Sequence, residues 1–170
     1  MTLRLTTLIT FGLLIGGCTF SVPQFEAGIR FVERVASGKS ETAQEPRATW
    51  LASVGDRGAV LNPYLSGGLT VFANVDGDAI AFDGWTIRSI TGFGLSSPVS
   101  ITGKDGVRVF VYGGRQTTTD CGAWTRSELN WEQICANGFG QITLDEAGNI
   151  QSITMALGNK LGIVTLRVAK

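Results

Sequence analysis

Apolar and polar residues alternate along most of the chain after residue 48, and this period of two is typical of strands in a half-buried sheet. Residues 107–112 (VRVFVY) place three valines on one face and Arg108, Phe110 and Tyr112 on the other. Segments that are rich in β-branched residues or alternate in this way predict ten strands, at residues 49–54, 58–62, 69–75, 78–82, 85–93, 99–102, 107–112, 139–144, 150–157 and 162–168.

Short turn sequences separate these segments. Asp76 and Gly77 stand between two of the strands, and this pair of residues favours a tight hairpin. Residues 104–106 (KDG) and 145–149 (DEAGN) separate two further pairs of strands. Short strands joined by such turns predict an all-β domain with a mainly antiparallel sheet, built as a sandwich or an incomplete barrel.

The sequence before residue 49 follows a different pattern. Residues 25–37 carry apolar side chains about once per helical turn, which predicts one short N-terminal helix. Residues 19–24 are expected to form a short tether, and residues 38–47 a polar linker. We therefore expect three parts, namely a signal peptide, an anchor with tether and helix, and a β domain, at residues 1–17, 18–48 and 49–170.

The first residues have the order of a bacterial lipoprotein signal peptide. Arg4 supplies a positive charge, and the apolar run after it has about a dozen residues, fewer than the roughly 20 of a membrane-spanning helix. Ile15, Gly16 and Gly17 then precede Cys18, as in a lipobox. This resemblance implies cleavage before Cys18, a diacylglycerol on its thiol and acylation of the new amine, for instance with palmitate. Two or more acyl chains anchor a protein firmly, so the lipid bilayer is the first expected partner.

The anchor also predicts a compartment. Thr19 follows the cysteine, where enterobacterial lipoproteins that stay in the inner membrane have aspartate. We therefore expect the bacterial envelope, at the outer membrane and facing the periplasm.

The other two cysteines are expected to form a disulfide in that oxidising compartment. Cys121 and Cys135 would close a loop of about 15 residues, which stabilises a fold by about 3 kcal/mol. Metal ligation and a redox pair are the alternatives. The sequence lacks the C-x-x-C spacing and the histidines that these alternatives usually need.

Charge and composition argue against several functions. The 14 basic and 14 acidic residues balance and no basic run occurs, so a nucleic-acid partner is not expected. There is no histidine, which is the usual general base and metal ligand. The acidic turn at 74–78 lacks the glycine and glutamate that complete a calcium loop. Asp145 and Glu146 are neighbours in a turn, not a pair across a cleft. The sequence predicts no catalytic residue, no metal site and no cofactor.

Tryptophans are the candidates for contact with a glycan or a protein, because an indole offers a large apolar face and one N–H donor. In β domains, however, such rings more often fill the core. Trp124 and Trp131 lie inside the expected disulfide loop together with Arg126. Since loops on a rigid scaffold carry many binding sites, we assign a glycan or partner contact to these three residues.

Two segments resemble one protein family. Residues 73–95 (ANVDGDAIAFDGWTIRSITGFGL) and 135–162 (CANGFGQITLDEAGNIQSITMALGNKLG) are similar to the YjbF/GfcB-type lipoproteins, the group 4 capsule lipoprotein family. The first segment has the strand, the D-G turn and the spaced glycines and threonine of the family. The second has the cysteine, the asparagine-aromatic strand, the aspartate and the serine. The lipobox followed by a short helix fits as well.

The resemblance implies a divergent, shortened member of a family of mainly antiparallel β lipoproteins, whose genes accompany capsule or exopolysaccharide export. No catalytic residues carry over from it. We therefore expect a non-catalytic periplasmic lipoprotein that is an accessory in this export or assembly, with export proteins or the polysaccharide as partners. Two alternatives stay open, an envelope protein-assembly or structural lipoprotein and a carboxylate-dependent enzyme acting on glycans.

Overall fold

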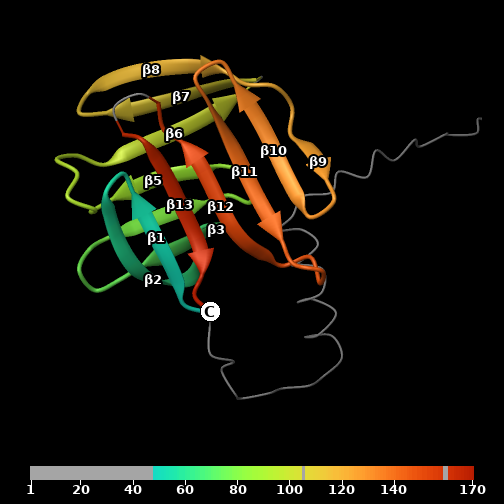
Figure 1. Cartoon of the computed structure of the whole chain (residues 1–170). Coiled ribbons are helices and arrows are strands. Elements are labelled where there is room, and N and C mark those ends of the chain that lie inside the picture. The colour runs from blue at the N-terminus through green and yellow to red at the C-terminus, as the bar shows by residue number, and fades with distance from the viewer. Residues whose placement is uncertain (1–47, 105, 159–160) are drawn as a thin grey trace, which may run out of the picture.

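The computed structural model describes residues 48–104, 106–158 and 161–170. Within these ranges the secondary structure consists of β-strands and contains no helix (Figure 1). The predicted all-β class is confirmed for this part. The strands are β1 (Trp50–Val54), β2 (Arg57–Ser66), β3 (Leu69–Ala73), β4 (Ala79–Phe82), β5 (Ile87–Thr91), β6 (Val99–Lys104), β7 (Val107–Tyr112), β8 (Arg115–Asp120), β9 (Thr125–Ser127), β10 (Asn130–Cys135), β11 (Gly138–Leu144), β12 (Ile150–Ala156) and β13 (Ile163–Val168). Cys18 and the helix predicted at 25–37 lie outside the described residues. Within the described ranges, no helix has the length and hydropathy of a membrane span.

All thirteen strands belong to one antiparallel sheet, in the order β8-β7-β6-β5-β4-β3-β2-β1-β13-β12-β11-β10-β9. Neighbours in this sheet are neighbours in the chain, with one exception. β1 pairs with β2 on one side and with β13 on the other, from Trp50 opposite Val168 to Val54 opposite Val164. The first and last strands therefore join two meanders, and β8 and β9 are the two edges of the sheet.

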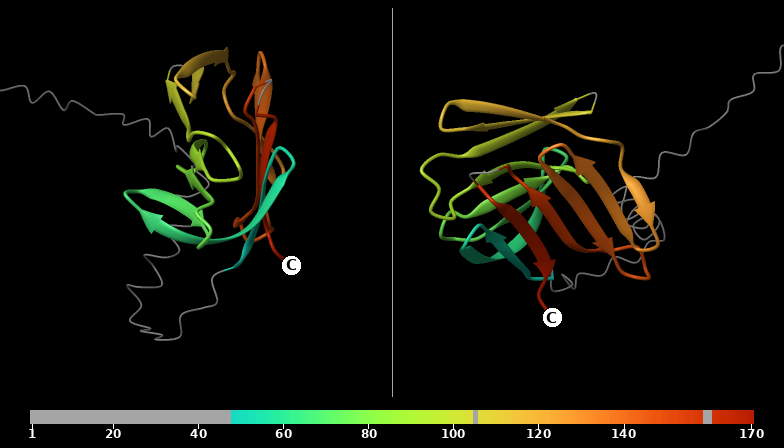
Figure 2. Two further views of the ribbon diagram at one scale, coloured as in Figure 1. Left: turned by 90° about the vertical axis from the view of Figure 1, so that its left-hand side faces the viewer. Right: turned by 45° about the horizontal axis from the view of Figure 1, so that its top comes forward.

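The long strand β2 turns the sheet over on itself. Its residues 57–61 pair with β1, whereas residues 62–66 pair with β3. As a result, β1 and β9 to β13 form one layer, and β3 to β8 form a second layer that faces it (Figure 2). We call these the β9–β13 layer and the β3–β8 layer. Of the two predicted architectures, the structure is the incomplete barrel.

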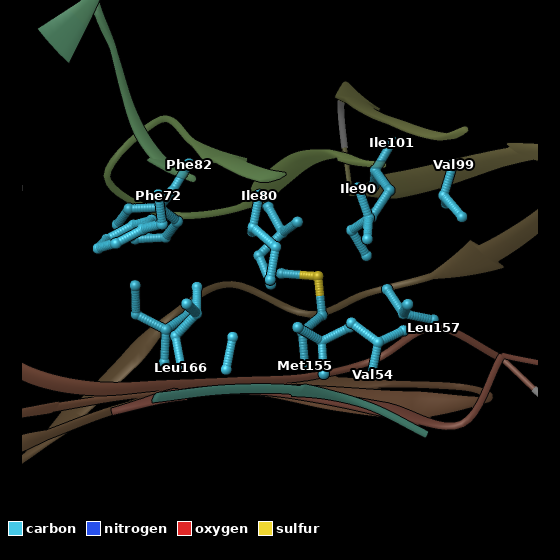
Figure 3. Packing of buried hydrophobic residues seen from close by; sticks show 14 of the residues in the cluster. Val54, Phe72, Ile80, Phe82, Ile90, Val99, Ile101, Met155, Leu157 and Leu166 are labelled. Carbon is cyan, nitrogen blue, oxygen red and sulfur yellow. The ribbon is translucent and has the colours of Figure 1, made fainter. Parts of the chain in front are cut away.

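Apolar side chains from both layers meet between them and form the core (Figure 3). In β1 the buried positions are Trp50, Ala52 and Val54, as the strand period of two requires. The fully buried side chains come from both layers and include Leu61, Ile80, Phe82, Ile90, Ile101, Ile142, Ile153, Met155 and Leu166. Burying one such side chain is worth roughly 1.5–3 kcal/mol, so this contact is what holds the two layers together.

The sequence pattern did not predict the strands β8, β9 and β10. The two edge strands, β8 and β9, are almost wholly exposed, so neither of them needs an apolar face. The predicted strands are all present, but some of their ends differ. The strand predicted to end at residue 62 continues through Pro63 to Ser66, and the one predicted at 85–93 is limited to Ile87–Thr91.

Candidate functional site

The predicted disulfide is present and joins the two layers at their edges. Cys121 follows β8 and Cys135 ends β10, with the two sulfurs 2.08 Å apart. Backbone hydrogen bonds flank the bond, from the Gly122 N–H to the Ile134 carbonyl at 2.8 Å and from the Ala136 N–H to the Asp120 carbonyl at 2.8 Å. The edge of the β3–β8 layer is therefore tied covalently to the β9–β13 layer.

An arginine lies inside the junction next to this disulfide. The covered face of β7 is the mixed one, with Arg108 and Phe110 buried, whereas Val107 and Val111 are exposed. Arg108 is 3% exposed, and its guanidinium donates a hydrogen bond to the Gln133 side-chain oxygen. Burial lowers the pKa of Arg108, because desolvation disfavours the charged form.

Gln133 in turn connects Arg108 to the disulfide loop. Its side-chain nitrogen donates to the Gly122 carbonyl at 2.8 Å. The amide therefore accepts from a buried cation on β7 and donates to the backbone next to Cys121. Sequence reasoning missed both residues, and the available signal was a single arginine in an otherwise apolar strand.

Three tryptophans form a cluster beside this arginine. The Trp85 ring lies 5.4 Å from the Trp124 ring and 5.0 Å from the Trp131 ring, between ring centroids. The Arg126 guanidinium lies 5.6 Å from the centre of the Trp131 ring. Trp124, Trp131 and Arg126, which the sequence analysis assigned to one site, therefore lie together in the structure.

The sequence did not predict that Trp85 joins them. Trp85 comes from the turn between β4 and β5, where the Asp83 carboxylate accepts the N–H groups of Trp85 and Thr86 at 2.9 and 2.7 Å. A Cβ at position 140 would lie 2.8 Å from the Trp124 ring, so Gly140 makes room for that ring. The three rings are half-buried and pack against the core, whereas Trp50 is a core residue in contact with Phe72.

A cleft of about 670 Å³ opens at another part of the junction, between the β7–β8 hairpin and the turns that follow β10 and β12. Its volume is in the range of small-molecule sites, roughly 300–1,000 Å³. Phe110 and Leu157 are the most deeply buried of the residues around it. The lining residues are Phe110, Tyr112, Arg115, Gln116, Thr117, Thr118, Thr119, Asn137, Leu157, Gly158 and Leu161.

The register of the β7–β8 hairpin explains this lining. Tyr112 pairs with Arg115, Phe110 with Thr117 and Arg108 with Thr119, so these six residues share the inner face. The Thr119 hydroxyl accepts the Asn137 N–H at 3.1 Å and so links the hairpin to the opposite layer. Sequence reasoning missed the cleft, because the wholly polar sequence of β8 (RQTTTD) has no apolar alternation; its three consecutive β-branched threonines were the available strand signal.

The acidic turn after β3 is held by its own side chains. Asn74 Oδ1 accepts the N–H groups of Asp76 and Asp78 at 3.0 Å each, and Asp78 Oδ1 accepts the Phe93 N–H at 2.5 Å. A Cβ on Gly92 would lie 2.4 Å from that Asp78 oxygen, so glycine is required there. These oxygens have a structural role in the turn.

The Asp145 carboxylate likewise stabilises its own turn. It accepts hydrogen bonds from the Asn149 side chain, the Asn149 backbone and the Gln151 side chain. These hydrogen bonds, with that of the Asn149 side chain first, lower the pKa of Asp145, whereas a general acid needs a raised pKa. No group of three His, Cys, Asp or Glu side chains in the described part of the chain is placed to hold a metal ion.

Comparison with known proteins links the fold to one solved structure. It is similar to the crystal structure of the hypothetical lipoprotein YmcC from Escherichia coli K12, with a TM-score of 0.53 and 10% sequence identity. The match covers 91% of this chain and 98% of that chain. No family model matches the sequence, and a search of curated proteins finds no significant match. At this identity the likeness concerns the fold alone.

Proposed function

We propose that the protein is a lipid-anchored lipoprotein of the bacterial envelope. Two independent observations support this. The N-terminal sequence carries the lipobox pattern Ile15-Gly16-Gly17-Cys18, and the solved structure that shares the fold over 98% of its own length is described as a lipoprotein. The fold likeness carries the proposal, because it was found without reference to the lipobox. The Cys121–Cys135 disulfide agrees with an oxidising compartment, as expected for the periplasm.

We further propose that the protein is a non-catalytic accessory in the export or assembly of a surface polysaccharide. The support is the resemblance of residues 73–95 and 135–162 to the capsule lipoprotein family. These two segments contribute to the junction between the layers from opposite sides. The first supplies Trp85, and the second supplies Asn137 and Leu157.

The mechanism that follows from this proposal is tethering combined with contact. Acyl chains on Cys18 hold the chain at the outer membrane, facing the periplasm. The exposed Arg126 beside Trp131, and the cleft under the β7–β8 hairpin, present side chains to a protein partner or to the polysaccharide. No step of this mechanism requires a catalytic group, a metal or a cofactor.

The test is surface polysaccharide in the source bacterium after deletion of the gene. The deletion strain is complemented with the wild type and with Cys18→Ala, and immunoblots of membrane and soluble fractions confirm equal amounts of both proteins. We expect polysaccharide to fall in the deletion strain and to return only with the wild type. Unchanged polysaccharide, under conditions where the strain makes it, would refute the export role and favour an assembly or structural lipoprotein.

A further inference from the structure

We propose that the cleft under the β7–β8 hairpin binds an acidic sugar unit, with Arg115 as the residue that recognises its negative charge. The choice of a sugar rests on the proposed function, whereas the negative charge is argued from the structure alone. The site differs from the tryptophan cluster and was not expected from the sequence.

The first argument concerns the mixture of groups in the cleft. Phe110, Leu157 and Leu161 offer apolar surface, while threonine hydroxyls and the Asn137 side chain surround it. Pyranose rings have apolar C–H faces and hydroxyls at their rims, so they need both kinds of contact. Along β8, inward side chains recur about every 7 Å, which places Arg115, Thr117 and Thr119 as a row along the cleft.

The second argument concerns free hydrogen-bonding groups. In the part of the chain that the structure describes, the side chains of Arg115, Gln116, Thr117 and Thr118 make no hydrogen bond or ion pair within the protein. These side chains are exposed, so water can accept or donate their hydrogen bonds. A ligand that displaces this water can replace each hydrogen bond with one to its own hydroxyl or carboxylate oxygens.

The third argument concerns charge. Among the described residues that line the cleft, Arg115 is the only charged one, and no described acidic side chain forms an ion pair with it. Arg108 lies on the same inner face, and no described carboxylate forms an ion pair with it. A partly enclosed surface with one sign of charge concentrates ions of the opposite sign. Guanidinium groups bind carboxylate, sulfate and phosphate oxygens in a bidentate way, so an anionic substituent on the sugar fits Arg115.

The experiment uses the full, lipid-anchored chain in nanodiscs made of a neutral phospholipid. Isothermal titration calorimetry measures binding of tetrasaccharides that carry uronate, sulfate or phosphate groups, or no charge, to the wild type, Arg115→Gln and Arg167→Gln. Arg167 is the matched control, because it is an exposed arginine on β13 that does not line the cleft. We expect at least one acidic tetrasaccharide to bind, the neutral one to bind at least tenfold more weakly, and Arg115→Gln to weaken the acidic one at least tenfold, with Arg167→Gln unchanged.

Three outcomes would overturn the inference. They are no binding of any acidic tetrasaccharide, equal binding of the neutral one, and an equal loss in both arginine variants. A fatty acid is titrated in parallel, and binding of the fatty acid without binding of any sugar would identify a lipid site and overturn the inference. The gene deletion separates this inference from the proposed function. Loss of surface polysaccharide without sugar binding refutes only the site, and sugar binding without any polysaccharide phenotype refutes only the export role.

Discussion

The junction between the two layers is filled at the tryptophan cluster and open at the cleft. At the cluster, three indole rings with centroids 5.0–5.4 Å apart occupy the space between the layers. At the cleft, two of the three inward residues of β8 are threonines, and about 670 Å³ stays open. Both regions lie at the junction between the two layers, and they differ in the size of the side chains that fill it. The same junction is therefore closed by large rings in one place and kept accessible by threonines in the other.

Removal of the disulfide should show the largest effect on stability, because the bond ties the two layers together. Replacing both cysteines, as Cys121→Ser with Cys135→Ser, removes the covalent link between β8 and β10. We expect the free energy of unfolding to fall by about 3 kcal/mol, as measured by urea denaturation followed by tryptophan fluorescence. Reduction of the wild type by dithiothreitol is the control and should give a similar loss. An unchanged urea midpoint would mean that the layers hold together without the bond.

The tryptophan cluster should show the next largest effect. We expect Trp85→Ala to destabilise the protein by about 2.5 kcal/mol, because half-buried rings contribute less than the roughly 3–5 kcal/mol of fully buried ones. Urea denaturation followed by circular dichroism measures this change. Val111→Ala, at an exposed position on β7, is the control and should change little. If Trp85→Ala were as mild as the control, the rings would not hold this part of the junction together.

Substitution of Gln133 tests how much the buried Arg108, which lies between the two regions, depends on its hydrogen-bond partner. Gln133→Leu removes the hydrogen-bond acceptor of Arg108 and leaves a buried guanidinium without that partner. We expect a loss of about 2 kcal/mol, which is the usual cost of an unsatisfied buried polar group. The double variant Gln133→Leu with Arg108→Met should recover part of this loss, because it also removes the charge. No recovery in the double variant would show that the glutamine acts through packing.

The cleft should show the smallest effect on stability. We expect Arg115→Gln and Thr117→Val each to change the free energy of unfolding by less than about 0.5 kcal/mol, because both residues are exposed and their side chains make no hydrogen bond or ion pair within the described residues. Thermal denaturation of the full chain checks this. A large loss in either variant would mean that these side chains support the fold and are not kept for a ligand.

The sequence predicted what depends on local pattern. The Asp76–Gly77 hairpin forms between β3 and β4 as expected, and the inward positions of β12 follow the predicted alternation. β8 was missed because its exposure at the sheet edge removes the apolar alternation on which strand prediction rests. The Cys121–Cys135 disulfide was predictable because the chain has only three cysteines, so few pairings are possible.

The site itself depends on contacts between residues far apart in the chain. Trp85 meets Trp124 and Trp131 only because β2 folds one layer over the other, and Leu157 reaches the cleft only because β1 joins β13. Neither event has a local sequence signal. The composition of the disulfide loop was therefore enough to select Trp124, Trp131 and Arg126, but not to find Trp85 or the cleft.

The pairing of β1 with β13 has a consequence for the order of folding. β1 obtains its second neighbour only when residues 163–168 are present, more than 100 residues after β1 itself. Each meander has mostly local contacts and can form early, and the 14-residue separation of Cys121 and Cys135 makes their bond a local event as well. Closing the gap between the first and last strands is the step with the largest loop entropy, and such non-local pairing slows folding. We therefore expect chains that are truncated before β13 to be incompletely folded and sensitive to proteases.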